Sequence, residues 1–250
     1  MYTPPPPHSR TTSSDDVIEL LHQANAKIKQ AQVKSLRHMG KPFGRDLAWQ
    51  HCFDYFRKSQ KDLVIQTPLV EKLDEAATHL SCYLAYFGMY RGSSTLLQTN
   101  RTILIPAIRE SWVCAAKFPD FLCTTNPSCV TLIRKTIRKE LSNSFSLLVS
   151  KSSPYISDIL VSKMMLGMFA CNLAYDVNVQ RGLNYFQEIG LKSSFSSNIG
   201  PWNTFSCVPE VLSFFKERQK EYYIEKEYVP FNRIADIFFF NLGLALSSSN

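Results

Sequence analysis

Glycine is scarce in this sequence. Nine of its 250 residues are glycine, whereas proteins built from sheets, or from alternating strands and helices, use glycine in many of their turns. Apolar residues recur instead three and four positions apart, which is the period of an amphipathic helix. We therefore expect an all-α fold, a single multi-helix domain of about eight to ten helices.

The histidines and cysteines lack the spacings that metal sites need. The five histidines lie in the first third of the chain, at positions 8, 22, 38, 51 and 79, and form no His-Glu-x-x-His pair. The seven cysteines include no Cys-x-x-Cys pair, and an odd number does not suit a framework of disulfides. We expect free thiols in a reducing compartment, no metal and no cofactor.

Long apolar runs are also missing. The longest, from Ile234 to Leu246, contains Asp236 and Asn241 and is too short to cross a bilayer. The opening stretch MYTPPPPHSRTTSSDD has no apolar core of a signal peptide. We expect a soluble cytoplasmic protein with no membrane contact.

Two common motifs of enzymes are also absent. Neither Gly-x-Ser-x-Gly nor Gly-x-Gly-x-x-Gly occurs.

Residues 1–13 are predicted to form a disordered proline-rich tail, and residues 14–250 one helical domain. Caps and periodicity predict helices that begin near Ser14, Asp46, Pro68, Pro106, Pro127, Pro154, Val177, Val208 and Phe231. Most of their ends are expected near Gly40, Lys61, Gly88, Val149, Ala170, Gly190, Glu227 and Leu246. An extended approach is expected before Pro106, and the serine-rich stretch LKSSFSSNIGPW is predicted to be a surface loop.

Positive charge is in excess, with a formal net charge of +7. The densest basic segment is IRKTIRKEL, in which Arg134, Lys135, Arg138 and Lys139 share one face of a predicted helix. This face is a candidate for contacts with the phosphates of nucleic acid. The alternative is a solvated face opposite the apolar side of the same helix.

A first polar turn, GMYRGSS, interrupts an apolar helical pattern. Gly88 and Gly92 permit close backbone approach or a positive φ, and Arg91 between them offers five donors. Together with Ser93 and Ser94, at the start of a short helix, Arg91 is a candidate grip for a phosphate or carboxylate. Alternatively, Arg91 satisfies carbonyls of the helix that it ends, or pairs with a buried acid.

A second polar turn, Ala174-Tyr175-Asp176, follows a strongly apolar helix. Asp176 is well placed to cap the next helix through its side chain. In the functional alternative, Asp176 and Lys163 are catalytic, with Asp176 as general base or electrostatic stabiliser, and Arg181 assists ligand binding.

Three segments carry a family resemblance: GMYRGSS, SKMMLGMFACNLAYD and YVPFNRIADIFFFNLG. Together they resemble an uncharacterised family of bacterial helical proteins with a Trp-Gly-Met-x-Arg-Gly-Ser-Ser turn and a later Pro-Ala-Tyr-Asp turn. This chain has Phe87 in place of that Trp and Leu173 in place of that Pro. The resemblance implies a helical fold and no particular activity.

The segment VSKMMLGMFACNLAYDVNVQRGL is also similar to oxoguanine-glycosylase-like proteins with the helix-hairpin-helix fold. That similarity implies DNA contact, with Asp176 as counterpart of the aspartate that assists base excision. The Gly-x-Gly of the hairpin is absent here, and no lysine stands at the expected catalytic place ahead of Asp176.

Three functions follow as hypotheses. The first is a nucleic-acid-associated protein, including DNA-base processing, which uses the basic face and a cleft between Arg91 and Asp176. The second is a non-catalytic interaction or scaffold protein whose polar turns are structural caps. The third is an enzyme acting on a small anionic ligand through Arg91. The residues leave open whether the chain is an enzyme, and they identify no protein partner.

Overall fold

The computed structural model describes residues 14–31, 44–65, 69–91, 94–148, 155–186, 202, 206, 209–219, 223–224 and 227–248. Within these ranges the fold is all-α, as predicted. The α-helices are α1 (Ser14–Gln30), α2 (Gly44–Lys58), α3 (Gln60–Leu63), α4 (Val70–Tyr86), α5 (Ile105–Ala115), α6 (Pro127–Leu148), α7 (Asp158–Phe169), α8 (Val177–Asn184), α10 (Pro209–Gln219) and α11 (Phe231–Ser248). Two 3₁₀-helices, η1 (Thr95–Gln98) and η2 (Arg101–Leu104), and an antiparallel pair, β1 (Tyr223–Ile224) and β2 (Glu227–Tyr228), complete these elements.

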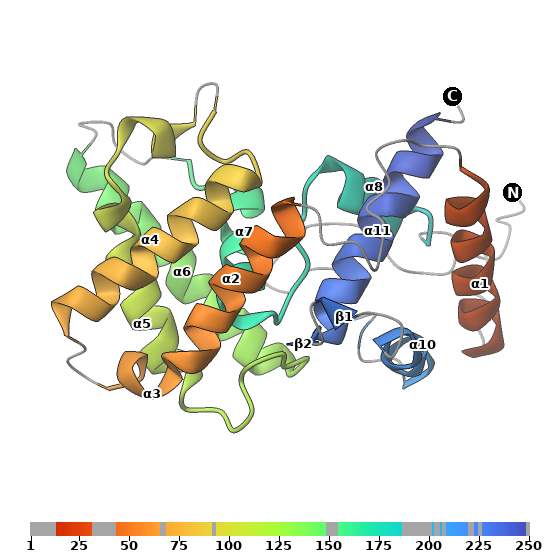
Figure 1. Cartoon of the computed structure of the whole chain (residues 1–250), viewed down its shortest axis with the longest axis horizontal. Coiled ribbons are helices and arrows are strands. Elements are labelled where there is room, and N and C mark those ends of the chain that lie inside the picture. The colour runs from red at the N-terminus through yellow and green to blue at the C-terminus, as the bar shows by residue number, and fades with distance from the viewer. Residues whose placement is uncertain are drawn as a thin grey trace, which may run out of the picture.

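The helices form two groups that lie side by side (Figure 1). Helices α2 to α7 make the first group, in which α5 packs against α6 and α4, and α2 against α4 and α7. Helices α1, α8, α10 and α11 make the second group, in which α11 packs against the other three. The chain therefore leaves the second group after α1 and returns to it only with α8.

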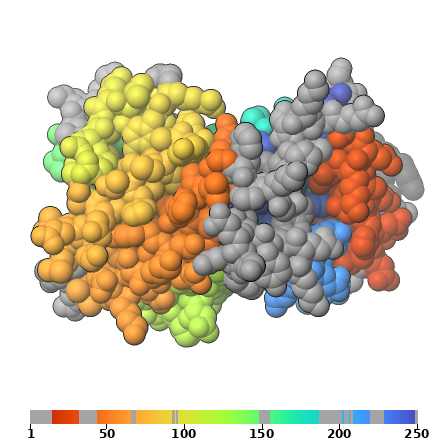
Figure 2. Space-filling model, viewed as in Figure 1, coloured from red at the N-terminus to blue at the C-terminus, as the bar shows by residue number. Residues whose placement is uncertain are grey.

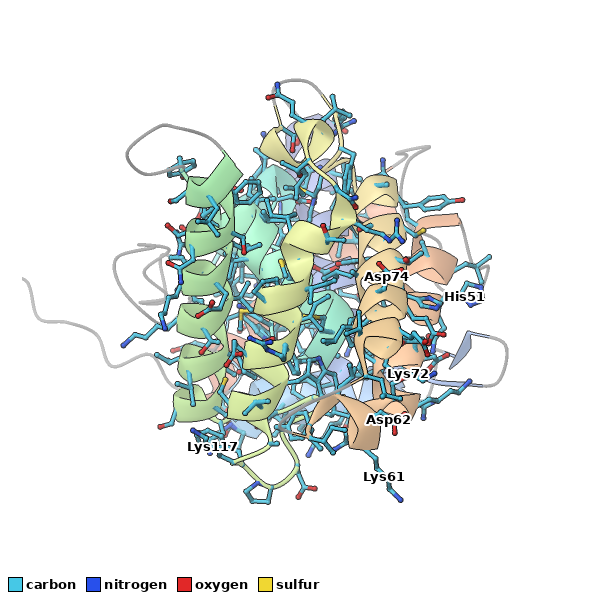
Figure 3. The ribbon with its side chains drawn as sticks, turned by 90° about the vertical axis from the view of Figure 1, so that its left-hand side faces the viewer. His51, Lys61, Asp62, Lys72, Asp74 and Lys117 are labelled. Carbon is cyan, nitrogen blue, oxygen red and sulfur yellow. The ribbon has the colours of Figure 1, made fainter. Side chains whose placement is uncertain are left out.

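The two sides of the first group are formed by different helices. Seen from its end, α6 lies on one side and α2 and α4 on the other, with α5 between them (Figure 3). The space-filling view places α2, α3 and α4 on one face of the molecule and α1 at the opposite end (Figure 2). Surfaces on α6 and on α2 are thus well separated.

Aromatic rings fill both groups. In the first group the Trp112 ring lies 5.0 Å from the Phe169 ring, and in the second the Trp202 ring lies 5.7 Å from the Phe239 ring. The consecutive residues Phe238, Phe239 and Phe240 of α11 are all buried. Among the described residues, no helix is long and apolar enough to cross a membrane.

Helices α8 and α11 approach each other unusually closely at two glycines. A Cβ atom added to Gly182 of α8 would lie 2.1 Å from the Phe239 carbonyl oxygen of α11. One added to Gly243 of α11 would lie 1.9 Å from the Asn178 carbonyl oxygen of α8. Both distances are far below van der Waals contact, so any side chain at these positions would force the helices apart.

Several predicted boundaries are confirmed. Helix α6 begins at Pro127, and the Asn126 side chain accepts hydrogen bonds from the Ser128 and Cys129 amides at 3.0 and 3.3 Å. Helix α5 begins at Ile105, with Pro106 in its first turn, and α11 begins at Phe231. Each of these starts has a local signal, a cap or a proline, that the sequence displays directly.

Other boundaries were predicted wrongly. The helix expected over residues 46–61 is interrupted at Ser59, whose carbonyl accepts from both the Asp62 and Leu63 amides. The helix expected from Pro154 begins at Asp158, because the Ser157 side chain accepts from the Leu160 amide and caps it there.

The approach to Pro106 is the 3₁₀-helix η2, capped by the Asn100 side chain, and not an extended segment. The helix expected to continue to Glu227 ends at Gln219. It is followed by the β1–β2 pair, in a stretch rich in tyrosine and β-branched residues that favour strands.

Some predictions concern residues outside the described ranges. These are the proline-rich tail over residues 1–13, residues 191–201 of the serine-rich stretch, the helix starts near Pro68 and Val208, and the helix ends near Gly40, Val149 and Gly190. Helix α4 begins at Val70, with Leu69 at the position of the cap.

Candidate functional site: a buried polar junction

The first polar turn is a helix end built on glycine. Gly88 follows α4 with a φ of 75°. Its amide donates to the Ala85 carbonyl, and the Met89 amide donates to the Leu84 carbonyl, each over 2.9 Å. This is the paired hydrogen-bond pattern with which a left-handed residue ends a helix. The prediction that Gly88 ends this helix is confirmed.

A buried lysine binds the same helix end. Lys163 of α7 is 5% exposed, and its Nζ donates to the Phe87 carbonyl over 2.8 Å. The ammonium also lies 5.8 Å from the centre of the Phe87 ring. A cation is favourable at a helix C-terminus, where carbonyls lack partners within the helix. Lys163, predicted as a catalytic residue, thus has the role that the structural alternative assigned to Arg91.

Arg91 itself is exposed. Its guanidinium folds back over Gly88, so that a Cβ atom added there would lie 2.8 Å from the Arg91 Cζ atom. Ser94 precedes the four-residue η1, and its side chain makes no capping hydrogen bond. Ser93, the other serine of the predicted anion grip, lies outside the described residues.

The second polar turn caps α8. The Asp176 Oδ1 atom accepts from the Asn178 and Val179 amides, each over 3.1 Å, so the predicted capping role is confirmed. The neighbouring Tyr175 is buried, and burial raises the pKa of its hydroxyl well above the ordinary value. Both Arg91 and Asp176 are described, and no hydrogen bond or ion pair joins them.

The strongest polar cluster was not predicted. Arg233 of α11 is fully buried and donates to the Asp46 Oδ1 atom of α2 and to the Asp236 Oδ2 atom, each over 2.6 Å. Its guanidinium lies 5.1 Å from the Trp49 ring and 5.6 Å from the Phe87 ring. Among the described residues, its Nε atom has no hydrogen-bond partner.

The same turn of α11 fixes the connection between α7 and α8. The Asp236 Oδ1 atom accepts from the Ala174 amide over 2.9 Å. The Asn232 side chain donates to the carbonyls of Ala170 and Cys123, over 2.8 and 3.4 Å. Ala170 and Cys123 both have a positive φ, of 47° and 59°, which residues other than glycine rarely adopt. The Asn232 side chain thus holds the carbonyls of two residues whose backbone conformations are unfavourable.

We call this set the junction cluster: Asp46, Lys163, Asn232, Arg233 and Asp236. It lies where α11 of the second group meets α2, the end of α4 and the α7–α8 connection of the first group. It also joins the three segments that carry the family resemblance. Lys163, in SKMMLGMFACNLAYD, contacts Phe87 and Met89 at the GMYRGSS turn. Asp236, in YVPFNRIADIFFFNLG, accepts from the Ala174 amide of the Lys163 segment. Arg233 pairs with both carboxylates of the cluster, which limits the cost of burying these three charges.

The predicted basic face of α6 is divided. Arg134 and Arg138 both donate to the Asp158 Oδ1 atom at the start of α7, the first over 2.6 Å. Arg138 also donates to the Ile156 carbonyl over 2.8 Å. Lys135 is exposed, and Lys139 is exposed with its Nζ 3.4 Å from Glu140. Half of this face therefore attaches α6 to α7, and the two lysines point to solvent.

Arg181 is also used within the fold. From α8 its Nη1 atom contacts the Ser247 hydroxyl and donates to the Gly243 carbonyl of α11 over 3.4 Å. It therefore reinforces the close α8–α11 contact. Within the described residues, no hydrogen bond or ion pair joins Arg181 to Arg91 or to Lys163.

Titratable groups outside the junction cluster have simple surroundings. The His79 ring stacks 4.1 Å from the Tyr55 ring between α4 and α2, and burial lowers the pKa of His79, against the opposing effect of Glu75. The six described cysteines are free thiols. Burial raises the pKa of Cys129 to about 11 and that of Cys123 to about 12, so these thiols are poorly reactive. In the described ranges no three His, Cys, Asp or Glu side chains lie where they could hold a metal ion.

No protein-family model, curated protein or solved structure matches the chain. The two resemblances therefore stay predictions, and the roles of residues follow from their geometry alone.

Sequence reasoning singled out Asp176, Lys163 and Gly88 but missed Arg233 and Asp46. One signal was available: Asp236 interrupts the longest apolar run of the chain. A charge on the buried face of a helix requires a partner of opposite sign. Arg233 is close in sequence, but nothing in the sequence points to Asp46, 187 positions away.

Proposed function

We propose that the chain is a non-catalytic helical binding protein in which the polar turns and the junction cluster hold the two helical groups together. The observation that carries this proposal is that the two candidate catalytic groups already have partners inside the fold. The Asp176 carboxylate accepts from two backbone amides, and the Lys163 ammonium donates to a helix-end carbonyl. A general base must instead reach a substrate proton directly or through one water.

The test separates capping from catalysis at one position. Serine caps helices about as well as aspartate, so Asp176→Ser should leave the melting temperature nearly unchanged, whereas Asp176→Ala should cost about 1 kcal/mol. Wild type and both variants would be incubated with oligonucleotides that carry damaged bases. We expect no excision by any of them. Excision by the wild type that Asp176→Ser abolishes, with the fold intact, would overturn the proposal.

A second candidate function is association with nucleic acid through α6. It is supported by the exposed side chains of Lys135 and Lys139, which lie about 6 Å apart along the helix axis. The excess of positive charge in the whole chain favours the same class of partner. Arg134 and Arg138 would act indirectly, since they position this part of α6 against α7.

The affinity for labelled oligonucleotides, measured by fluorescence anisotropy at several salt concentrations, tests this candidate. Reversing both charges in Lys135→Glu/Lys139→Glu should weaken binding and reduce the slope of log affinity against log salt by about 1.5. The matched control is Lys58→Glu/Lys61→Glu. This double variant changes the net charge by the same amount as the α6 variant. Its two positions lie in α2 and α3, on the side of the first group away from α6 (Figure 3). Equal losses in both variants would indicate attraction by net charge alone and contradict a site on α6.

A further inference from the structure

An exposed aromatic ring stands beside the basic face of α6. The Tyr155 side chain is 85% exposed, although the backbone that follows it is firmly held. Arg138 of α6 donates to the Ile156 carbonyl, the Ile156 side chain is buried, and Ser157 caps α7. The ring is therefore presented to solvent next to a backbone that is held on its C-terminal side, so binding on the ring would cost the protein little backbone entropy there.

The surroundings of Tyr155 are charged and polar. The two arginines and two lysines of α6 face two acids, Asp158 and Glu140, so this surface keeps an excess of positive charge. The next turns of α6 expose Asn143 and Ser146 as well as Leu147. A site for a folded protein partner would be expected to have an apolar centre with a polar rim. A single aromatic ring next to cations is instead the combination that binds single strands, where a base stacks on the ring and phosphates contact the cations.

We propose that Tyr155 is a stacking platform for an unpaired base of single-stranded nucleic acid whose phosphates contact Lys135 and Lys139. This inference rests on the second candidate function and adds to it a preference for single strands. Bases in a duplex are covered by their neighbours on both faces, so the ring contributes nothing to duplex binding. The lysines contribute to both forms, because both carry phosphates.

The experiment compares one labelled strand, alone and annealed to its complement, at low salt. Tyr155→Ala should weaken single-strand binding by about 5- to 150-fold, with duplex affinity and the salt slope unchanged. Tyr155→Phe keeps the ring and should bind like the wild type. Tyr86→Ala is the matched control, because Tyr86 of α4 is also exposed, at 59%, and its ring lies next to Gly44 of α2.

Three results would overturn the inference, and they differ in whether the second candidate function fails with it. If Tyr155→Ala binds single strands like the wild type while the α6 lysine reversal weakens binding, the stacking platform fails and the α6 site stands. If Tyr155→Phe loses as much affinity as Tyr155→Ala, the contact is made by the hydroxyl and not by the ring. If the wild type binds neither form at low salt, the second candidate function fails together with the inference.

Discussion

Replacing Arg233 by methionine is the most demanding test of the junction cluster. Methionine has a similar length and no charge, so the packing against the Trp49 and Phe87 rings is largely kept. The carboxylates of Asp46 and Asp236, both almost fully buried, then lose the cation that lies 2.6 Å from each. The perturbation is therefore the loss of the cation between two buried carboxylates, and not a cavity.

The expected loss is large. Removing one partner of a buried ion pair costs about 3–5 kcal/mol, a substantial part of the total stability of an ordinary protein, about 5–15 kcal/mol. For a chain of this size, the melting temperature should fall by roughly 6–20 °C. Removing the charges as well, in Asp46→Asn/Arg233→Met/Asp236→Asn, should recover at least half of this loss. The side-chain amide introduced by Asp236→Asn would keep an oxygen that can accept from the Ala174 amide.

Thermal unfolding followed by circular dichroism, and urea unfolding for the free energies, would measure both effects. Arg109→Met is the control, because Arg109 pairs with Glu110 on the surface and such pairs contribute about 0–1 kcal/mol. If Arg233→Met stays within about 1 kcal/mol of the wild type, or if the triple variant is less stable than the single one, the reasoning about uncompensated charge is wrong.

Three further predictions concern other parts of the fold. Gly182→Ala should lower the melting temperature by about 4–8 °C, since overpacking at the α8–α11 contact costs about 2 kcal/mol. The control is Gly44→Ala, which should be neutral or stabilising because a Cβ atom there lies 3.7 Å from its nearest neighbour. Burial lowers the pKa of His79 in the folded state. The contribution of His79 to the free energy of unfolding is therefore present above about pH 6.5 and is lost as the pH falls. His79→Gln should make the free energy of unfolding depend less on pH between about pH 7 and 5. Cys82 is exposed, so Cys82→Ser should remove one equivalent of fast reaction with a thiol reagent, and an unchanged fast phase would contradict that exposure.

Local signals predicted a large part of the fold. The apolar period gave the number and class of the helices. The helix starts at Pro127 and after Asp176, and the helix end at Gly88, were recognised because a cap involves only positions within one turn. Predictions failed where a competing local signal was overlooked, as at Ser157, which lies three residues after Pro154 and caps α7 through its hydroxyl.

The junction cluster could not be predicted in the same way. Its central contact joins residues far apart in the chain, and many acids could equally have been chosen as the partner of Arg233. Asn232 is a second example, since its role depends on the carbonyls of Cys123 and Ala170, and neither of these residue types indicates the positive φ that it adopts. Sequence identifies a buried charge by its apolar neighbours, but only the fold identifies what neutralises it.

The buried charges also bear on where a function can be located. Apolar replacements of a buried ion pair are often no less stable, so the junction cluster is explained better by the geometry that it imposes than by the stability that it adds. Arg233 forms hydrogen bonds in fixed directions to α2 and within α11, and Asp236 does so to the α7–α8 connection. Such directional hydrogen bonds restrict the alignment of the two groups more narrowly than apolar contacts, which have no preferred direction. Under the proposed function, the polar segments that first suggested a catalytic cleft align the helices, and the proposed binding surface is the outer face of α6 with Tyr155 beside it.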